Sequence, residues 1–212
     1  MKSKQVNLFL TTTLFLILGV SSMNGQINSN KTENTSLQTA TFGAGCFWCV
    51  EAVFQSLNGV EKVTSGYSGG KVKKPSYKQV TTGTTGHAEV CQITYNPKTI
   101  GYDELLEVFW STHDPTTLNK QGADVGTQYR SVIFYHNEKQ RKAAEKYKTE
   151  LNKQKVFEKS IVTEIKNFSE FFVAEDYHQN YFNENGNQPY CSFVILPKLE
   201  KFKKVFKEKL KK

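Results

Sequence analysis

Apolar and polar positions follow two different periods along this chain. Short runs of apolar and β-branched residues predict strands at 39–44, 60–67, 87–95, 129–135, 161–165 and 171–173. Apolar residues that recur every three or four positions predict helices at 46–57, 76–80, 102–110 and 138–152. Because helices alternate with strands that can pair antiparallel, we expect an α/β (α+β) fold: a two-layer sandwich with a mixed sheet and a ferredoxin-like core. The long polar loop at 113–127 is expected to carry function.

The end of the chain has its own helical pattern. After Pro197, apolar residues recur at helical spacing at Leu199, Phe202, Val205, Phe206 and Leu210. This spacing predicts a C-terminal amphipathic helix that docks on the body and turns a lysine-rich face to solvent. The alternative is that this face binds a membrane surface or a partner.

The formal net charge of +8 is unevenly distributed. Residues 198–212 hold eight lysines and two glutamates, and two more lysines lie among the first four residues. The body between them carries 18 basic and 18 acidic residues, so it is neutral. The basic composition therefore does not indicate nucleic-acid binding by the body.

The first 25 residues differ from the rest of the chain. Lys2 and Lys4 precede a short apolar run at 8–20, and small residues follow it. This order is typical of a signal peptide at 1–25, and the run is too short for a comfortable membrane span; an uncleaved amphipathic anchor is the alternative. We expect a flexible leader at 26–37, one catalytic domain at 38–212, and an exported protein, periplasmic or secreted, without a stable membrane span.

The four cysteines are too few for a disulfide-stapled scaffold of this length. Cys46 and Cys49 form a C-x-x-C pair, which is found in redox sites and in zinc sites. Zinc normally needs a second close pair of cysteines or histidines, and the sequence has none. The spacing therefore does not favour a zinc site.

The segment Gly45-Cys46-Phe47-Trp48-Cys49 places a cysteine where a strand turns into a helix. Free backbone N–H groups at a helix start favour a thiolate. The adjacent aromatic side chains of Phe47 and Trp48 could form the wall of an apolar pocket for a small methyl-bearing group. The alternative is a structural cysteine among core aromatics.

Glu89 lies at the apolar start of a predicted strand, within Gly86-His87-Ala88-Glu89-Val90. In an apolar pocket its carboxyl would stay protonated near neutral pH and could donate a proton. The alternative is a glutamate on an edge strand that faces water, with His87 hydrogen-bonded or exposed.

Several stretches together resemble the A-type peptide methionine sulfoxide reductases. They occur in the order of that family between about Phe42 and Pro197. Besides residues 45–49, they are Gly66-Tyr67-Ser68-Gly69-Gly70, Gly86-His87-Ala88-Glu89, His113-Asp114-Pro115-Thr116-Thr117, Asp124-Val125-Gly126-Thr127-Gln128-Tyr129-Arg130-Ser131 and Glu175-Asp176-Tyr177-His178-Gln179.

The resemblance implies reduction of the S epimer of free and protein-bound methionine sulfoxide. Cys46 would be the nucleophile and Glu89 the acid that protonates the sulfoxide oxygen. The remaining roles implied are hydrogen bonds to that oxygen from Tyr77 and Tyr129, a polar wall at Asp124, and a cradle for the methyl group formed by Phe47 and Trp48.

The resemblance also implies that a second thiol converts the Cys46 sulfenic acid into a disulfide. Cys191 resembles the C-terminal resolving position of the family, and Cys49 is the alternative. Only one cysteine stands near the C-terminus, which excludes a second disulfide relay there, and Cys91 is expected in the core. A thioredoxin-like reductant, no metal or organic cofactor and a monomer are expected.

Two other functions compete with this interpretation. A thioredoxin-like disulfide oxidoreductase would use Cys46 and Cys49, but it gives no reason for Glu89, Tyr77 or Tyr129. A non-enzymatic binding module would leave Cys46 with ordinary thiol reactivity. A Cys–His–Asp hydrolase with His178 and Asp176 is disfavoured by the matched motifs, in which both are scaffold residues.

Overall fold

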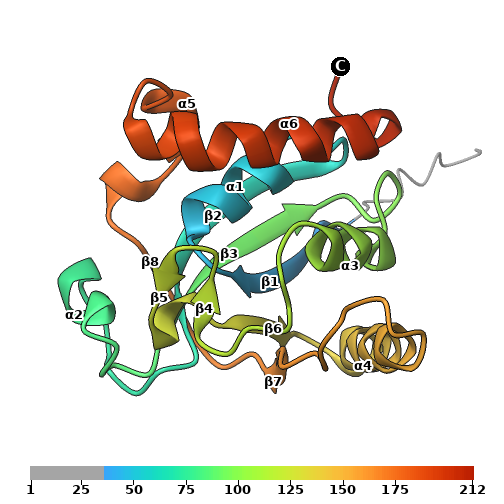
Figure 1. Ribbon diagram of the computed structural model, residues 1–212, viewed down its shortest axis with the longest axis horizontal. Helices are drawn as coiled ribbons and strands as arrows, with labels where there is room; N and C mark the ends of the chain where they lie inside the picture. The colour runs from blue at the N-terminus through green and yellow to red at the C-terminus, as the bar shows by residue number, and fades with distance from the viewer. Residues whose placement is uncertain (1–35) are drawn as a thin grey trace, which may run out of the picture. The chain divides into compact units, whose positions relative to one another are not determined.

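The computed structural model of the protein describes residues 36–212, which are built around one six-stranded sheet (Figure 1). The strands are β1 (Gln38–Ala44), β2 (Val60–Ser68), β3 (Ala88–Tyr95), β6 (Ser131–Tyr135), β7 (Glu164–Asn167) and β8 (Phe171–Val173). They lie in the order β7-β6-β1-β3-β2-β8. Only β6 and β7 pair in parallel, so the sheet is mixed.

The helices are α1 (Phe47–Gln55), α2 (Tyr77–Thr81), α3 (Tyr102–Ser111), α4 (Glu138–Lys153), α5 (Tyr181–Glu184) and α6 (Leu196–Val205). α1 connects β1 to β2 and α3 connects β3 to β6, while β3 pairs antiparallel with both β1 and β2. The four central strands therefore have the order β6-β1-β3-β2 of a ferredoxin-like core. The expected fold class is confirmed.

The main core lies between the helices and one face of the sheet. Phe42 of β1 has its ring centroid 5.0 Å from that of Phe109 on α3 and 5.6 Å from that of Phe54 on α1. All three are fully buried, and burial of a side chain of this size contributes about 1.5–3 kcal/mol. A smaller cluster on the other face joins Ala88, Val90, Val132 and Phe134.

Two segments differ from the sequence prediction. The predicted loop at 113–127 contains a hairpin of β4 (Lys120–Gln121) and β5 (Asp124–Val125), and a 3-10 turn at Thr127–Tyr129 delays the next strand to residue 131. The strand predicted at 161–165 begins only at Glu164. The reason is that the N–H groups of Ile161 and Val162 bond the Asn152 side chain and the Pro115 carbonyl instead of a strand.

The C-terminal amphipathic helix is present as α6, after one π-helical turn at Cys191–Ile195. It runs beside α1 (Figure 1) and buries Leu199 and Phe202. Beyond it, the N–H of Asn58 bonds the Lys209 carbonyl at 2.8 Å, and the N–H of Lys211 bonds the Ser56 carbonyl at 2.9 Å. The end of the chain thus closes over the end of α1.

None of the helices within residues 36–212 is both long enough and apolar enough to cross a bilayer. The signal peptide expected at 1–25 and most of the leader expected at 26–37 lie outside the described residues.

Candidate active site

The backbone at the end of β1 fixes the position of Cys46. Gly45 has a φ of +91°, and a Cβ at this position would lie 2.6 Å from Cγ of Gln121. Glycine alone adopts this conformation without strain and leaves room for the β4–β5 hairpin. Cys46 follows as the N-cap of α1, with φ −56° and ψ 124°, so the helix begins at Phe47.

A cavity of about 200 Å³ opens beside Cys46. It is lined by Cys46, Phe47, Trp48, Tyr77, Glu89, Asp124, Tyr129 and Tyr190. These include all seven residues that the sequence suggested for the catalytic and substrate-binding positions. The fold brings them together from the start of α1, from α2, β3, β5 and the 3-10 turn at Thr127–Tyr129, and from the segment before α6. The eighth residue, Tyr190, was not anticipated.

Glu89 is a buried carboxyl on a central strand, 1% exposed, and not an edge-strand residue facing water. The N–H of Phe47, in the first turn of α1, donates to its Oε2 at 3.1 Å. Burial raises the pKa of Glu89 to about 8, and the nearby Asp124 and Cys49 add to the rise. Glu89 is therefore mainly protonated at neutral pH and can act as a proton donor.

His87 serves the scaffold next to this strand. Its Nδ1 accepts the N–H of Gly70 at 3.1 Å, and its Nε2 lies 2.7 Å from the Val72 carbonyl. The histidine ties the loop after β2 to the start of β3, which is the hydrogen-bonded alternative expected from the sequence.

The two residues of the C-x-x-C pair lie in the first turn of the helix, where the N–H of Cys49 donates to the Cys46 carbonyl at 3.1 Å. Burial raises the pKa of the Cys46 thiol well above its ordinary value, and Cys49 and the Glu89 carboxyl add to the rise. The prediction of a thiolate at the helix start is therefore wrong for the resting site, where Cys46 is a protonated thiol. Here burial outweighs the helix N-terminus, whose first N–H is already bonded to Glu89. The Cys46 thiol lowers the pKa of Cys49, and Lys198 contributes to the same effect.

Aromatic rings surround the entrance to the thiol. Trp48 stacks on Tyr181 with ring centroids 3.6 Å apart and planes 7° apart. Phe47 lies more deeply, with its ring 6.5 Å from that of Tyr77 and nearly parallel to it. Trp48 and Phe47 therefore form two parts of one apolar wall, as the sequence suggested.

His178 fixes the position of Trp48. The indole Nε1 donates to His178 Nδ1 at 3.2 Å, so the imidazole proton is on Nε2, which lies 4.0 Å from Glu175 Oε2. His178 is buried, and Asp176 is exposed. Because His178 is engaged by Trp48, it is part of the scaffold and not the base of a Cys–His–Asp hydrolase.

Glu175 connects the sheet to α2. It accepts the hydroxyl of Tyr67 at 2.9 Å and the N–H of Tyr77 at 2.8 Å. These bonds hold Tyr77 at the start of its helix, where its side chain reaches the cavity. Burial raises the pKa of Tyr77 to about 12 and raises that of Tyr129 as well, so both hydroxyls remain hydrogen-bond donors.

Tyr190 connects the acidic wall to the thiols. Its hydroxyl donates to Asp124 Oδ2 at 2.9 Å, and Tyr190 acts to lower the pKa of both Cys46 and Cys49. Its ring lies edge-on to Trp48, with centroids 5.8 Å apart. The available signal was its position directly before Cys191, because a residue next to a candidate resolving cysteine is brought to the same site.

The remaining two cysteines are buried. Cys191 begins the π-helical turn before α6 and is fully buried in this reduced form. Cys91 is a core residue, as expected, and its thiol donates to the Phe47 carbonyl with a sulfur–oxygen distance of 3.4 Å. Within residues 36–212, the His, Cys, Asp and Glu side chains form no group of three that could hold a metal ion.

Comparison with known proteins gives one consistent family. The family model described as peptide methionine sulfoxide reductase matches residues 38–210. The peptide methionine sulfoxide reductase MsrA of Saccharolobus solfataricus is 54% identical over 175 residues, which cover 82% of this chain and 98% of that protein.

Two solved structures from Saccharomyces cerevisiae are also similar. Mxr1 in its reduced form has a TM-score of 0.69 at 38% identity, covering 74% of this chain and 91% of the yeast chain. Mxr1 in complex with Trx2 has a TM-score of 0.50 at 27% identity, covering 73% of this chain and 91% of the yeast chain.

Proposed function

Because the chain belongs to the peptide methionine sulfoxide reductase family, we propose that it reduces the S epimer of free and protein-bound methionine sulfoxide, with Cys46 as the nucleophile. As a member of this family it is a thiol-dependent oxidoreductase that works with a thioredoxin-type reductant. One observation carries the assignment of roles: Cys46 and a protonated, buried Glu89 line the same aromatic cavity.

The size of the cavity suits the reacting end of the substrate. Its volume of about 200 Å³ corresponds to roughly six or seven water molecules at about 30 Å³ each. This accommodates a methyl group, a sulfinyl group and the neighbouring methylene. Phe47 and Trp48 contact the methyl group, while Glu89, Tyr77 and Tyr129 supply O–H donors to the sulfoxide oxygen.

The first step transfers oxygen from one sulfur to another. The Cys46 sulfur attacks the sulfoxide sulfur while Glu89 protonates the oxygen, which is a poor leaving group until it is protonated. The oxygen moves to Cys46 as a sulfenic acid and methionine leaves. The proton from the Cys46 thiol replaces the one that Glu89 donated, so the step needs no external proton.

We place Cys49 first in the next step. It lies one helical turn from Cys46, whose carbonyl accepts its N–H at 3.1 Å, and its lowered pKa favours the attacking thiolate. Attack on the sulfenic sulfur forms a Cys46–Cys49 disulfide and releases water. Cys191, which the sequence favoured, remains the alternative; it would have to leave its buried position to reach Cys46.

The resolving cysteine can be identified by mass-spectrometric mapping of disulfides. The protein is given one equivalent of methionine sulfoxide without reductant, as the parent chain and as the Cys49→Ser and Cys191→Ser variants. Resolution by Cys49 predicts a Cys46–Cys49 disulfide that survives in Cys191→Ser and disappears in Cys49→Ser. A Cys46–Cys191 disulfide that survives in Cys49→Ser and disappears in Cys191→Ser would show that Cys191 resolves the sulfenic acid.

The activity itself is tested with the two epimers of a blocked methionine sulfoxide and dithiothreitol. We expect loss of the S epimer only, and no loss with Cys46→Ser. If folded, reduced protein consumes neither epimer, the assignment fails. The same assay on dialysed protein, with EDTA and no added cofactor, tests the further proposal that no metal or organic cofactor is needed. Size-exclusion chromatography tests the proposal of a monomer.

We also propose that the protein is exported, to the periplasm or outside the cell, after removal of residues 1–25. The support is the order of basic, apolar and small residues at the start of the sequence. N-terminal sequencing of the protein from fractionated cells tests this. A chain that retains Met1 in the cytoplasmic fraction would contradict it.

A further inference from the structure

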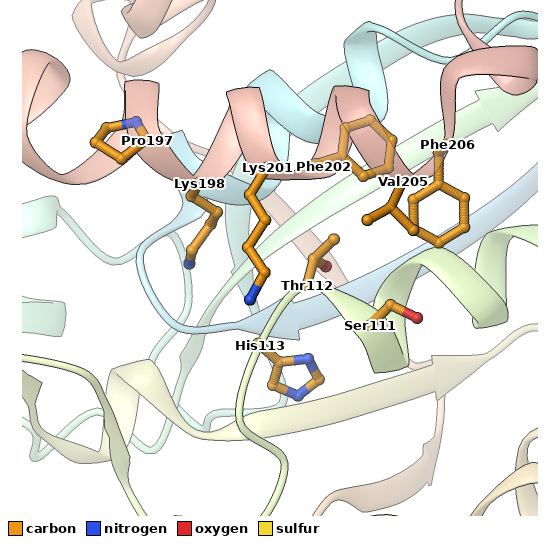
Figure 2. A pocket seen from close by; sticks show the side chains of 9 residues that line it. All are labelled: Ser111, Thr112, His113, Pro197, Lys198, Lys201, Phe202, Val205 and Phe206. Atoms are coloured by element: carbon orange, nitrogen blue, oxygen red, sulfur yellow. The ribbon is translucent and has the colours of Figure 1, made fainter.

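A second cavity lies between the end of α3 and α6, and it shares none of its lining residues with the site beside Cys46. Its volume is about 450 Å³. Four of its residues, Pro197, Phe202, Val205 and Phe206, provide apolar surface, and Val205 is 67% exposed. Figure 2 shows the side chains of Lys198 and Lys201 directed from α6 toward the segment after α3, near His113. We call this surface the α3–α6 groove.

The two lysines have no acidic partner within residues 36–212. No acidic residue lines the α3–α6 groove, and burial lowers the pKa of His113 to about 4, so that the imidazole is neutral. The His113 nitrogens face the Phe109 carbonyl and the Ser131 hydroxyl. Lys209, near the other end of the same segment, contrasts with them because it pairs with Glu104 and Glu107. The charges of the groove are therefore available to a partner from outside.

The α3–α6 groove is connected to the thiol pair through α6, because this helix forms one wall of the groove and packs on α1, which carries Cys49. Lys198, which lines the groove, contributes to the lowering of the Cys49 pKa. Both α6 and the π-helical turn before it pack on α1, which carries Cys49. The sulfoxide cavity, in contrast, is lined by Cys46 and not by Cys49.

This placement distinguishes between the two macromolecules that must reach the enzyme. The oxidised polypeptide delivers its sulfoxide to Cys46, through the smaller cavity. The reductant must reach the disulfide that Cys46 forms, and the groove is built on α6, which packs on the helix that carries the candidate partner Cys49. Unpaired cations around an apolar floor are complementary to an acidic surface with apolar contacts, and such charges mainly accelerate association.

We propose that the α3–α6 groove is the docking surface for an acidic, thioredoxin-like reductant, with Lys198 and Lys201 as its electrostatic contacts. The proposal rests on the proposed function, because it assumes a thiol pair that a protein reductant must reduce.

The test uses Lys201, which is exposed and is placed nowhere in the catalytic site. Sulfoxide reduction by the purified protein is driven either by a bacterial thioredoxin of net negative charge with its NADPH-dependent reductase, or by dithiothreitol. Lys201→Glu is expected to raise the KM for thioredoxin about fivefold or more at low salt, with little change in kcat. Lys201→Gln should give an intermediate value. The difference should shrink toward 1 M salt, where the Debye length is about 3 Å.

The matched control is Lys146→Glu, which makes the same charge change on α4, beside a different cavity. It should leave the KM for thioredoxin unchanged, and turnover with dithiothreitol should be equal in all variants. Equal effects of Lys201→Glu and Lys146→Glu would overturn the proposal. So would a rise in the KM for a sulfoxide-containing peptide instead of thioredoxin, because the groove would then bind substrate. Failure of the parent protein with dithiothreitol would reject the proposed function instead.

Discussion

Replacing Glu89 by Gln separates catalysis from stability in this fold. Gln keeps the shape of the side chain and an oxygen that can accept the N–H of Phe47. It cannot donate an acidic proton to the sulfoxide oxygen. Loss of a general acid typically lowers a rate by about 10²–10⁴-fold, and we expect a decrease of that size in kcat/KM at pH 7.

The same substitution should stabilise the protein at neutral and higher pH. A carboxyl whose pKa is higher in the folded than in the unfolded chain stabilises the fold most when it is protonated, and this contribution is lost as the pH rises through the folded-state pKa. The pKa of the Glu89 carboxyl rises from 4.5 to about 8 in the folded chain because the group is buried. A difference of one pKa unit corresponds to about 1.36 kcal/mol. The ionisable carboxyl therefore lowers the free energy of unfolding by about 3 kcal/mol at pH 7 and by about 5 kcal/mol above pH 8.

The assay is urea unfolding of the parent protein and of Glu89→Gln at pH values from 4.5 to 8.5. The extra N–H group of the amide offsets part of the gain, by about 1–3 kcal/mol if it finds no partner. The diagnostic quantity is therefore the difference between the two unfolding free energies as a function of pH. It should increase in favour of Glu89→Gln by about 3 kcal/mol between pH 4.5 and 7.

A difference that stays constant over this range would refute the reasoning, because Glu89 would then ionise equally in the folded and unfolded chains. The control is Glu150→Gln, which makes the same side-chain change on the exposed side of α4, outside the site. In the parent enzyme, the rate of methionine formation should fall as Glu89 loses its proton above about pH 8.

Three further predictions concern the support of the site and of the fold. His178→Phe keeps a ring but leaves the Trp48 indole N–H without its acceptor. In steady-state kinetics it should raise the KM for sulfoxide more than it lowers kcat, by an amount equivalent to about 1–3 kcal/mol of binding free energy. A change in kcat alone would count against this role. Tyr190→Phe removes the hydrogen bond to Asp124 and should lower kcat/KM about tenfold without changing the melting temperature. Unchanged kinetics would show that the Tyr190 hydroxyl takes no part in the reaction. Deletion of residues 207–212 removes two backbone hydrogen bonds to the end of α1. It should lower the free energy of unfolding, measured in urea, by about 1–3 kcal/mol. A stability equal to that of the full chain would show that the chain end contributes nothing.

Local patterns in the sequence were sufficient to predict most of the elements. Residues 39–44, 60–67 and 87–95 were predicted as strands because apolar and β-branched residues cluster there, and they form β1, β2 and β3. The helix that begins after Cys46 and the amphipathic helix at the C-terminus depend on the same kind of local spacing. The boundaries at Tyr129 and Ile161 were wrong: the N–H of Tyr129 bonds Gly126 within a 3-10 turn, and the N–H of Ile161 bonds the Asn152 side chain instead of a strand.

The site was partly visible in the sequence for a different reason. Chemistry restricts the residue types that can serve as nucleophile and acid, and the spacing around Cys46 and Glu89 resembled a known family. The structure places these residues with Tyr77, Tyr129 and Asp124 around one cavity. Their catalytic roles stay predictions for the experiments above.

The sequence by itself determined most of the strands and helices and the neutral body with its basic end, because these depend on neighbours in the chain. Only the tertiary structure decided that Tyr190 hydrogen-bonds Asp124 in the site, that His178 holds Trp48, and that the pKa of Cys46 is raised. Such properties depend on burial and on contacts between segments more than 60 residues apart, such as Asp124 and Tyr190 at a separation of 66 residues. Local sequence patterns do not encode these contacts, whereas the packing of helices on the sheet creates them.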